Sequence, residues 1–137
     1  MRIILDTNVV ISAVFFGGIP GQVLNAWHER RLDLIVSPSI LSEYRRVGGI
    51  LSEKYEGVDF EPFAALLAVH ATVVDAPDHL VEPVCRDADD DKFLACALAA
   101  DVHCIISGDG DLLEVSGWKG IEVLRPRPFV TRYLSRV

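Results

Sequence analysis

The stretch Arg2-Ile3-Ile4-Leu5-Asp6-Thr7-Asn8 decides the fold of this chain. A short apolar run of β type ends at an acid and turn-forming residues, which predicts a buried strand followed by a turn. A second stretch of the same design runs from His103 to Ser107, and Gly108-Asp109-Gly110-Asp111 follows it. Each stretch therefore places an aspartate at, or just past, the carboxyl end of a predicted strand.

The rest of the sequence alternates between strand and helix patterns. Further strands are predicted at residues 32–36, 72–74 and 121–124, and helices at 21–31, from 38 onward, at 61–69, 92–100 and 110–115, with a closing helix or tail through Phe129 and Tyr133. This alternation predicts an α/β fold with a mostly parallel central sheet. At 137 residues we expect a single domain over residues 1–137. Ligands of such sheets bind beyond the carboxyl ends of the strands, where Asp6 and Asp109 are expected.

Two of the predicted helices bring further acids toward that edge. Ser37-Pro38 is a strong start signal, because serine caps a helix and proline suits its first position. Glu43 lies near the start of this helix, and Gly48-Gly49 is expected to interrupt it. Asp91 begins the apolar stripe of the 92–100 helix, so its side chain is expected to point toward the sheet.

These acids predict a binding site for a hard divalent cation. Taken singly, each has an ordinary alternative as a cap, a turn residue or a solvated helix residue. Together they form a group of carboxylates that repel one another unless a cation shares them, and hard cations prefer oxygen ligands. The candidate ligands are Asp6, Glu43, Asp91 and Asp109, with Asp111 assisting. The cysteines and histidines have no spacing that suggests zinc.

The charge distribution is more informative than the net charge of −7, which by itself argues against a nucleic-acid partner. Residues 71–124 carry 12 acidic and 3 basic groups, whereas residues 125–137 carry four arginines and no acid. The negative charge is therefore concentrated. No apolar run approaches the length that crosses a bilayer, and the three cysteines suit a reducing compartment, so a cytoplasmic protein without a membrane partner is expected.

In order and spacing, four blocks of the sequence resemble the PIN-domain family of nucleases. The blocks are residues 4–8, 37–43, 89–95 and 105–113, and the resemblance covers residues 2–125. It looks closest to the branch related to the VapC-type toxins of toxin–antitoxin pairs. The resemblance implies a PIN-like three-layer α/β/α domain, a Mg²⁺ or Mn²⁺ site, ribonuclease activity, a homodimer and an antitoxin partner.

Carried over residue by residue, the resemblance assigns catalysis and metal binding to four acids. They are Asp6, Glu43, Asp91 and Asp109, with Asp111 as an assisting ligand. The third block departs from the pattern because Asp89 and Asp90 precede Asp91, which leaves the register of the third acid open. The apolar residues that follow favour Asp91.

The expected reaction is hydrolysis of phosphodiester bonds in single-stranded RNA, with bound metal activating a water molecule and stabilising the charge that develops at phosphorus. Asn8 and Ser107 are expected to support the ligands or to contact phosphate. Arg45 and Arg46 are candidates for holding the RNA backbone, and a solvated role for both is equally compatible with the sequence.

Two other functions remain open at this point. A PIN-shaped module that binds protein or RNA without turnover has the same acids. A phosphotransferase that forms an aspartyl-phosphate also places an aspartate after its first strand, but typically has a second acid where this chain has Asn8. It also needs a well-placed lysine, for which only Lys119 lies in a suitable loop.

Overall fold

The computed structural model of the chain describes residues 1–135. Its centre is a five-stranded sheet in the order β3-β2-β1-β4-β5, and every neighbouring pair of strands is parallel. The strands are β1 (Arg2–Leu5), β2 (Asp33–Val36), β3 (Thr72–Val73), β4 (Cys104–Ile106) and β5 (Glu122–Leu124). The predicted α/β class and parallel sheet are confirmed, and all five predicted strands are present.

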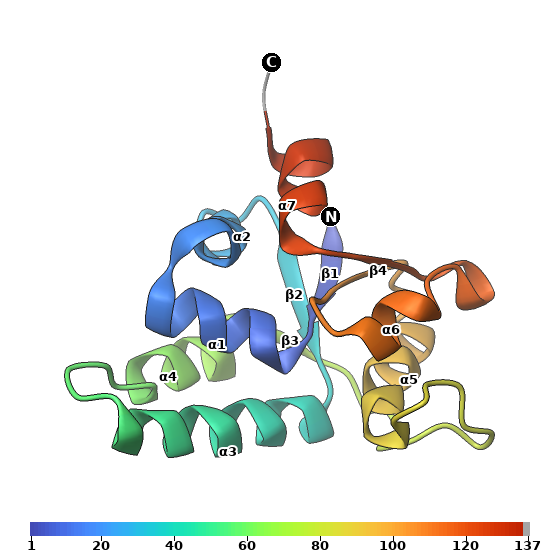
Figure 1. Ribbon diagram of the computed structural model, residues 1–137, viewed down its shortest axis with the longest axis horizontal. Helices are drawn as coiled ribbons and strands as arrows, with labels where there is room; N and C mark the ends of the chain where they lie inside the picture. Colours follow the sequence, from blue (N-terminus) through green and yellow to red (C-terminus); the bar gives the residue numbers. More distant parts are fainter. Residues whose placement is uncertain (136–137) are drawn as a thin grey trace.

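Helices lie on both sides of this sheet (Figure 1). The longer ones are α1 (Thr7–Phe16), α2 (Gly18–His28), α3 (Pro38–Lys54), α4 (Glu61–His70) and α5 (Asp91–Ala100). The shorter ones are η1 (Ala88–Asp90), α6 (Gly110–Glu114), η2 (Trp118–Gly120), α7 (Pro126–Phe129) and η3 (Val130–Leu134). In the view of Figure 1, α1, α2 and α4 lie to the left of β1 and β2, and α5 and α6 lie to their right.

The first helix corrects the prediction of a turn after Asp6. Thr7 begins α1 directly after the strand, without an intervening loop. The β-branched residues of this segment have low helix propensity, but Val9, Val10 and Ile11 are buried, and burial outweighs the small intrinsic penalty. Gly17, with φ of 73°, then turns the chain into α2, which begins three residues earlier than predicted.

The lengths of the helices show whether any of them could span a membrane. Among residues 1–135, no single helix is both long and apolar enough to cross a membrane. Taken together, α1 and α2 are long and apolar enough to cross a membrane, but the chain bends by 97° between them.

Helix α3 corrects a second expectation, because it continues through Gly48 and Gly49 to Lys54. Gly48 is buried, and a Cβ atom at this position would lie 2.4 Å from Cγ of Phe60. The glycine is therefore there for close packing of the Phe60 ring on the helix, and its conformational freedom is not used. Gly49 has open space around it.

These two glycines form a matched pair for a stability test. Gly48→Ala is expected to lower the free energy of unfolding by about 1–2 kcal/mol, because the added methyl group overlaps the Phe60 ring. Gly49→Ala is expected to raise it by about 0.5–1 kcal/mol through helix propensity alone. Urea unfolding followed by circular dichroism measures both. A stabilising effect of Gly48→Ala would contradict the packing described here.

The sheet brings its central strands together where the candidate site is expected. Residues 3–5 and 34–36 and the end of β4 are almost completely buried, as is typical of parallel strands covered on both faces. Because β1 and β4 are parallel neighbours, their carboxyl ends meet, and the Asp6 amide donates a hydrogen bond of 2.9 Å to the Ile106 carbonyl. The residues that follow each strand therefore share one edge of the sheet.

Candidate functional site

Ser107 connects the aspartates that follow the two central strands. Its hydroxyl donates a hydrogen bond of 2.7 Å to Oδ2 of Asp6 and accepts one of 2.9 Å from the backbone amide of Asp109. Asp6 and Ser107 are both buried. Burial raises the pKa of Asp6, the Ser107 hydrogen bond opposes this, and the charges of Asp109 and Glu43 raise it further. The structure thus brings Asp6 and Asp109 together, with Ser107 between them.

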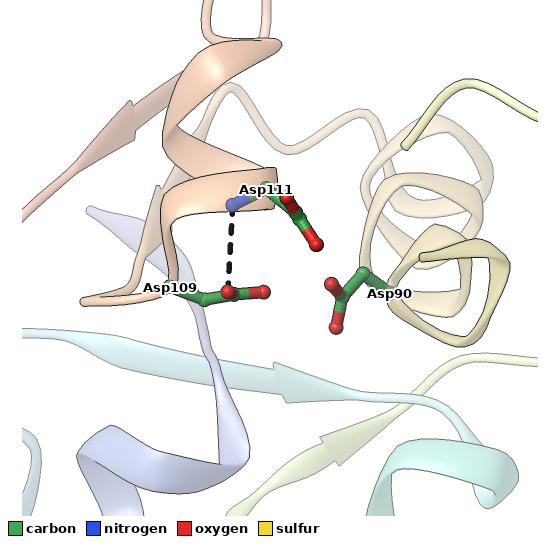
Figure 2. A group of neighbouring side chains, drawn as sticks. All are labelled: Asp90, Asp109 and Asp111. Atoms are coloured by element: carbon green, nitrogen blue, oxygen red, sulfur yellow. Dashed lines mark hydrogen bonds between the residues drawn. The ribbon is translucent and has the colours of Figure 1, made fainter. Parts of the chain in front are cut away.

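Three carboxylates meet beside this pair. Asp90, Asp109 and Asp111 each offer an oxygen, and these oxygens all lie within 4.8 Å of one another. Figure 2 shows Asp90 facing the other two across the gap between the start of α5 and the start of α6. Asp109 caps α6, and its Oδ1 accepts a hydrogen bond of 3.4 Å from the Asp111 amide. We call Asp90, Asp109 and Asp111 the acidic cluster.

Burial and mutual repulsion make it unfavourable for all carboxylates of the acidic cluster to be ionised. Burial, a hydrogen bond and charge repulsion from Asp109, and repulsion from Asp6 and Asp87 together raise the pKa of Asp90 to about 8. A divalent cation bound between these carboxylates would offset the repulsion that contributes to this raised pKa.

The structure brings Asp90, and not the predicted Asp91, to the acidic cluster. The Asp91 side chain is 1% exposed, and its two oxygens accept hydrogen bonds from the backbone amides of Val84 and Cys85, at 3.0 and 2.8 Å. It therefore fastens the connection before η1 to the start of α5. The sequence pattern favoured Asp91 because it assumed α-helical spacing at the start of α5. Asp90 lies in the 3-10 turn η1 just before α5, where this spacing does not apply.

Glu43 lies near these acids but has its own partners. One of its oxygens accepts a hydrogen bond from the Thr7 hydroxyl, and the other lies 2.5 Å from Nζ of Lys92. The Lys92 side chain is only 7% exposed and also contacts Oδ1 of Asp89 at 3.2 Å. Burial lowers the pKa of Lys92, but the hydrogen bonds to Glu43 and Asp89 outweigh it and leave the pKa raised. Lys92 is thus a cation at neutral pH.

Exposed arginines surround the acids. Arg86 has its Nε 3.7 Å from Oδ1 of Asp111, and its side chain is 88% exposed. Arg46 approaches Oε1 of Glu43 at 4.0 Å, and Arg125 donates to the Gly108 carbonyl at 3.4 Å. Of the other predicted residues, Asn8 is exposed in the first turn of α1, and Arg45 is exposed on α3.

The residues of the acidic cluster fit a divalent metal ion. The donors are all carboxylate oxygens, the ligands that Mg²⁺ and Mn²⁺ prefer. Two oxygens on opposite sides of Mg²⁺ are about 4.2 Å apart, so the separations within the cluster need little change to accept an ion. The raised pKa of Asp90 reflects burial and neighbouring negative charges, and a bound cation would offset both.

Comparison with known proteins places this geometry in a family. A family model described as "PIN domain" matches residues 2–111. The chain belongs to the PIN-domain family. Proteins with PIN domains are generally nucleases, and these nucleases use divalent metals. The edge of the sheet that carries the acidic cluster is thus the candidate active site of this PIN domain.

Two further comparisons show a related sequence and a related fold. An uncharacterized protein of Methanocaldococcus jannaschii is 35% identical over 118 residues, which make up 84% of this chain and 75% of that protein. A chain in the crystal structure of VapBC2 from Rickettsia felis, bound to a DNA fragment from their promoter, aligns with a TM-score of 0.59. That alignment covers 91% of this PIN domain chain and 98% of the other, at 10% identity, and so confirms the fold.

Sequence reasoning missed three residues of the site, namely Thr7, Asp90 and Lys92. Thr7 was assigned to a turn, and its hydroxyl reaches Glu43 only because α1 begins there. Asp90 belongs to the run of acids in which the sequence leaves the register of the third acid open, and the apolar residues that follow favour Asp91 instead. Lys92 carried a usable signal, because a lysine at the start of an otherwise apolar helix must find a negative partner if it is buried.

Proposed function

We propose that this PIN domain is a Mg²⁺- or Mn²⁺-dependent endoribonuclease that hydrolyses single-stranded RNA. The observation that carries the proposal is the acidic cluster, three carboxylates gathered at the carboxyl edge of a parallel sheet, where Arg86, with an 88% exposed side chain, lies 3.7 Å from Asp111. Membership of the PIN-domain family supports nuclease chemistry at this edge.

The contacts of each residue indicate its proposed role. Asp90, Asp109 and Asp111 would hold the ion, which would supply an activated water molecule and charge stabilisation at the phosphodiester. Ser107 orients Asp6 through its hydroxyl, so that Asp6 is presented rigidly beside Asp109. Asp91, predicted from sequence as a ligand, is proposed instead to fix the start of α5 and thereby the position of Asp90.

The exposed arginines near the acids would hold the RNA backbone. Arg46 and Arg86 lie beside carboxylates and are largely exposed, so each can turn toward a phosphate of the RNA backbone. Arg45 on the same helix is a weaker candidate. Single-stranded RNA is proposed because it follows from the toxin-like resemblance of the sequence blocks.

A partner protein forms part of the proposal. The fold neighbour from Rickettsia felis is a VapBC2 complex, which supports the proposal that this chain is the toxin component of a toxin–antitoxin pair. A homodimer is proposed from the resemblance of the sequence blocks alone. We expect it to act in the cytoplasm, where its three free, buried cysteines remain reduced.

The test is metal-dependent cleavage of a single-stranded RNA. Purified protein is expected to cut with Mn²⁺ or Mg²⁺ and to stop cutting when a chelator is added. Asp6→Asn is expected to lower kcat/KM by about 100-fold, because a charge facing the reacting groups is lost while its shape is kept. Asp33→Asn, an exposed carboxylate at the opposite end of the sheet, serves as the matched control.

The outcomes separate the candidate functions. Binding of Mn²⁺ and RNA without any cleavage would favour a PIN-shaped binding module. Equal cleavage by wild type and Asp6→Asn, or cleavage that survives the chelator, would refute the metal-dependent mechanism.

A further inference from the structure

Lys92 is a buried cation inside an acidic site. It lies in the first turn of α5, two residues after Asp90, and its side chain is almost completely enclosed. A buried ammonium group is costly unless it is paired and hydrogen-bonded. Lys92 meets this condition through Glu43 at 2.5 Å and Asp89 at 3.2 Å. Because Asp89 is exposed, Glu43 is the partner that offsets most of the cost of burial.

Glu43 in turn has no oxygen left without a donor. The Lys92 ammonium binds one oxygen and the Thr7 hydroxyl binds the other. The carboxylates of the acidic cluster differ from it in this respect. They face one another, and among the described residues the one ion pair that they form is with Arg86, whose Nε lies 3.7 Å from Asp111 and whose side chain is 88% exposed. The site therefore has two parts. In one part Lys92 neutralises Glu43, and the other part is the acidic cluster.

We propose that the Lys92 ammonium occupies the place of a second metal ion, so that this centre binds a single divalent cation. That cation belongs to the acidic cluster, and Glu43 is a fixed partner of Lys92 and not a metal ligand. This inference rests on the proposed metal site. Lys92 is a positioning residue, because it acts on the charge and orientation of Glu43 and does not touch the substrate.

The physical argument is one of charge. Five carboxylates surround the site, namely Asp6, Glu43, Asp90, Asp109 and Asp111. One divalent cation and the Lys92 ammonium supply three positive charges. The guanidinium groups of Arg46 and Arg86, 4.0 Å from Glu43 and 3.7 Å from Asp111, bring the total to five, which balances the five carboxylates without a second divalent ion. A second divalent ion near Glu43 would also have to displace a hydrogen-bonded ammonium group that has no other buried partner.

The decisive measurement is the number of Mn²⁺ ions bound per chain, from isothermal titration calorimetry and from electron paramagnetic resonance of bound Mn²⁺. Wild type is expected to bind one ion. Lys92→Met keeps an apolar stem and frees Glu43, so it is expected to bind a second, weaker ion. Lys92→Arg keeps the charge and is expected to bind one.

A double variant removes both members of the pair at constant net charge. Glu43→Gln with Lys92→Met is expected to return the stoichiometry to one, with a Kd for Mn²⁺ within about threefold of wild type, because the pair contributes no ligand and its removal leaves the net charge unchanged. Two ions in wild type, or a Kd weakened by more than about tenfold in the double variant, would overturn the inference.

The design keeps this inference separate from the proposed function. If Asp90→Asn binds Mn²⁺ as tightly as wild type, the acidic cluster is not the metal site and the proposed function fails. If Asp90→Asn loses the ion while wild type binds two, only the role of Lys92 is wrong. Should Lys92→Met fail to fold, the stoichiometry of wild type and the affinity of the neutral double variant still decide the question.

Discussion

Asp90→Asn and Asp91→Asn are expected to give opposite results, although they remove the same charge from neighbouring residues. Asp90 faces Asp109 and Asp111, so Asp90→Asn should lower RNA cleavage by about 1,000-fold and weaken Mn²⁺ binding. The same change removes repulsion within the acidic cluster, so the metal-free protein should become more stable. Loss of function would thus accompany a gain in stability.

Asp91→Asn acts on the fold. An asparagine side chain can accept only one of the two hydrogen bonds that the Val84 and Cys85 amides donate, and its amide group faces a donor instead. We expect a loss of about 2–3 kcal/mol in the free energy of unfolding, with cleavage by the folded fraction within about tenfold of wild type.

Cleavage assays at 20 °C and urea unfolding of both variants check this pair. Asp75→Asn, an exposed carboxylate in the connection after β3, serves as the matched control for both measurements. If folded Asp91→Asn lost Mn²⁺ binding and Asp90→Asn retained it, the sequence-based assignment of Asp91 would be restored and the placement of Asp90 would be wrong.

The metal-free protein is expected to lose stability as the pH rises from about 5 to 8. The pKa of Asp90 is about 8 in the folded chain, against an ordinary value of 3.8, so the folded state keeps a proton that the unfolded state has released. Stability therefore falls with rising pH between these two values. The raised pKa of Asp6 acts in the same direction.

Because Asp90 is only half-buried, solvent screening reduces the effect to about 2 kcal/mol, or about 6 °C in Tm for a chain of this length. Thermal unfolding in EDTA at pH 5.5 and pH 8 measures it. Addition of Mn²⁺ should restore the lost stability at pH 8 and have little effect at pH 5.5, and Asp90→Asn should flatten the profile. A Tm in EDTA that does not change over this range, or that rises, would contradict the crowding of charge in the acidic cluster.

The sequence predicted the sheet well because parallel strands have a local signature. Short apolar blocks bounded by turn residues identified all five strands, and the meeting of Asp6 with Asp109 followed from the rule that parallel strands end at one edge. Ser107, predicted to support the ligands, indeed lies between these two aspartates. These features depend on the pattern of a few neighbouring residues and on topology.

The missed features depend on contacts between distant residues. Helix α1 forms in a segment rich in β-branched residues because the fold buries it. Helix α3 continues through Gly48 because Phe60 packs on that glycine, and the residues near Gly48 in the sequence do not predict this contact. The choice between Asp90 and Asp91 depends on where the backbone amides of Val84 and Cys85 lie, which no spacing rule contains.

The hydrogen bonds of Asp91 also determine how the long connection between β3 and η1 can evolve. At one end the Val74 amide is bound to the Val36 carbonyl, and at the other Asp91 holds residues 84 and 85. Between these anchors the chain is largely exposed, and Val81 is fully so. Substitutions at the exposed positions between residues 75 and 83 are therefore expected to leave Asp90 in place, whereas Ala76 and Leu80 pack against the core and tolerate less change.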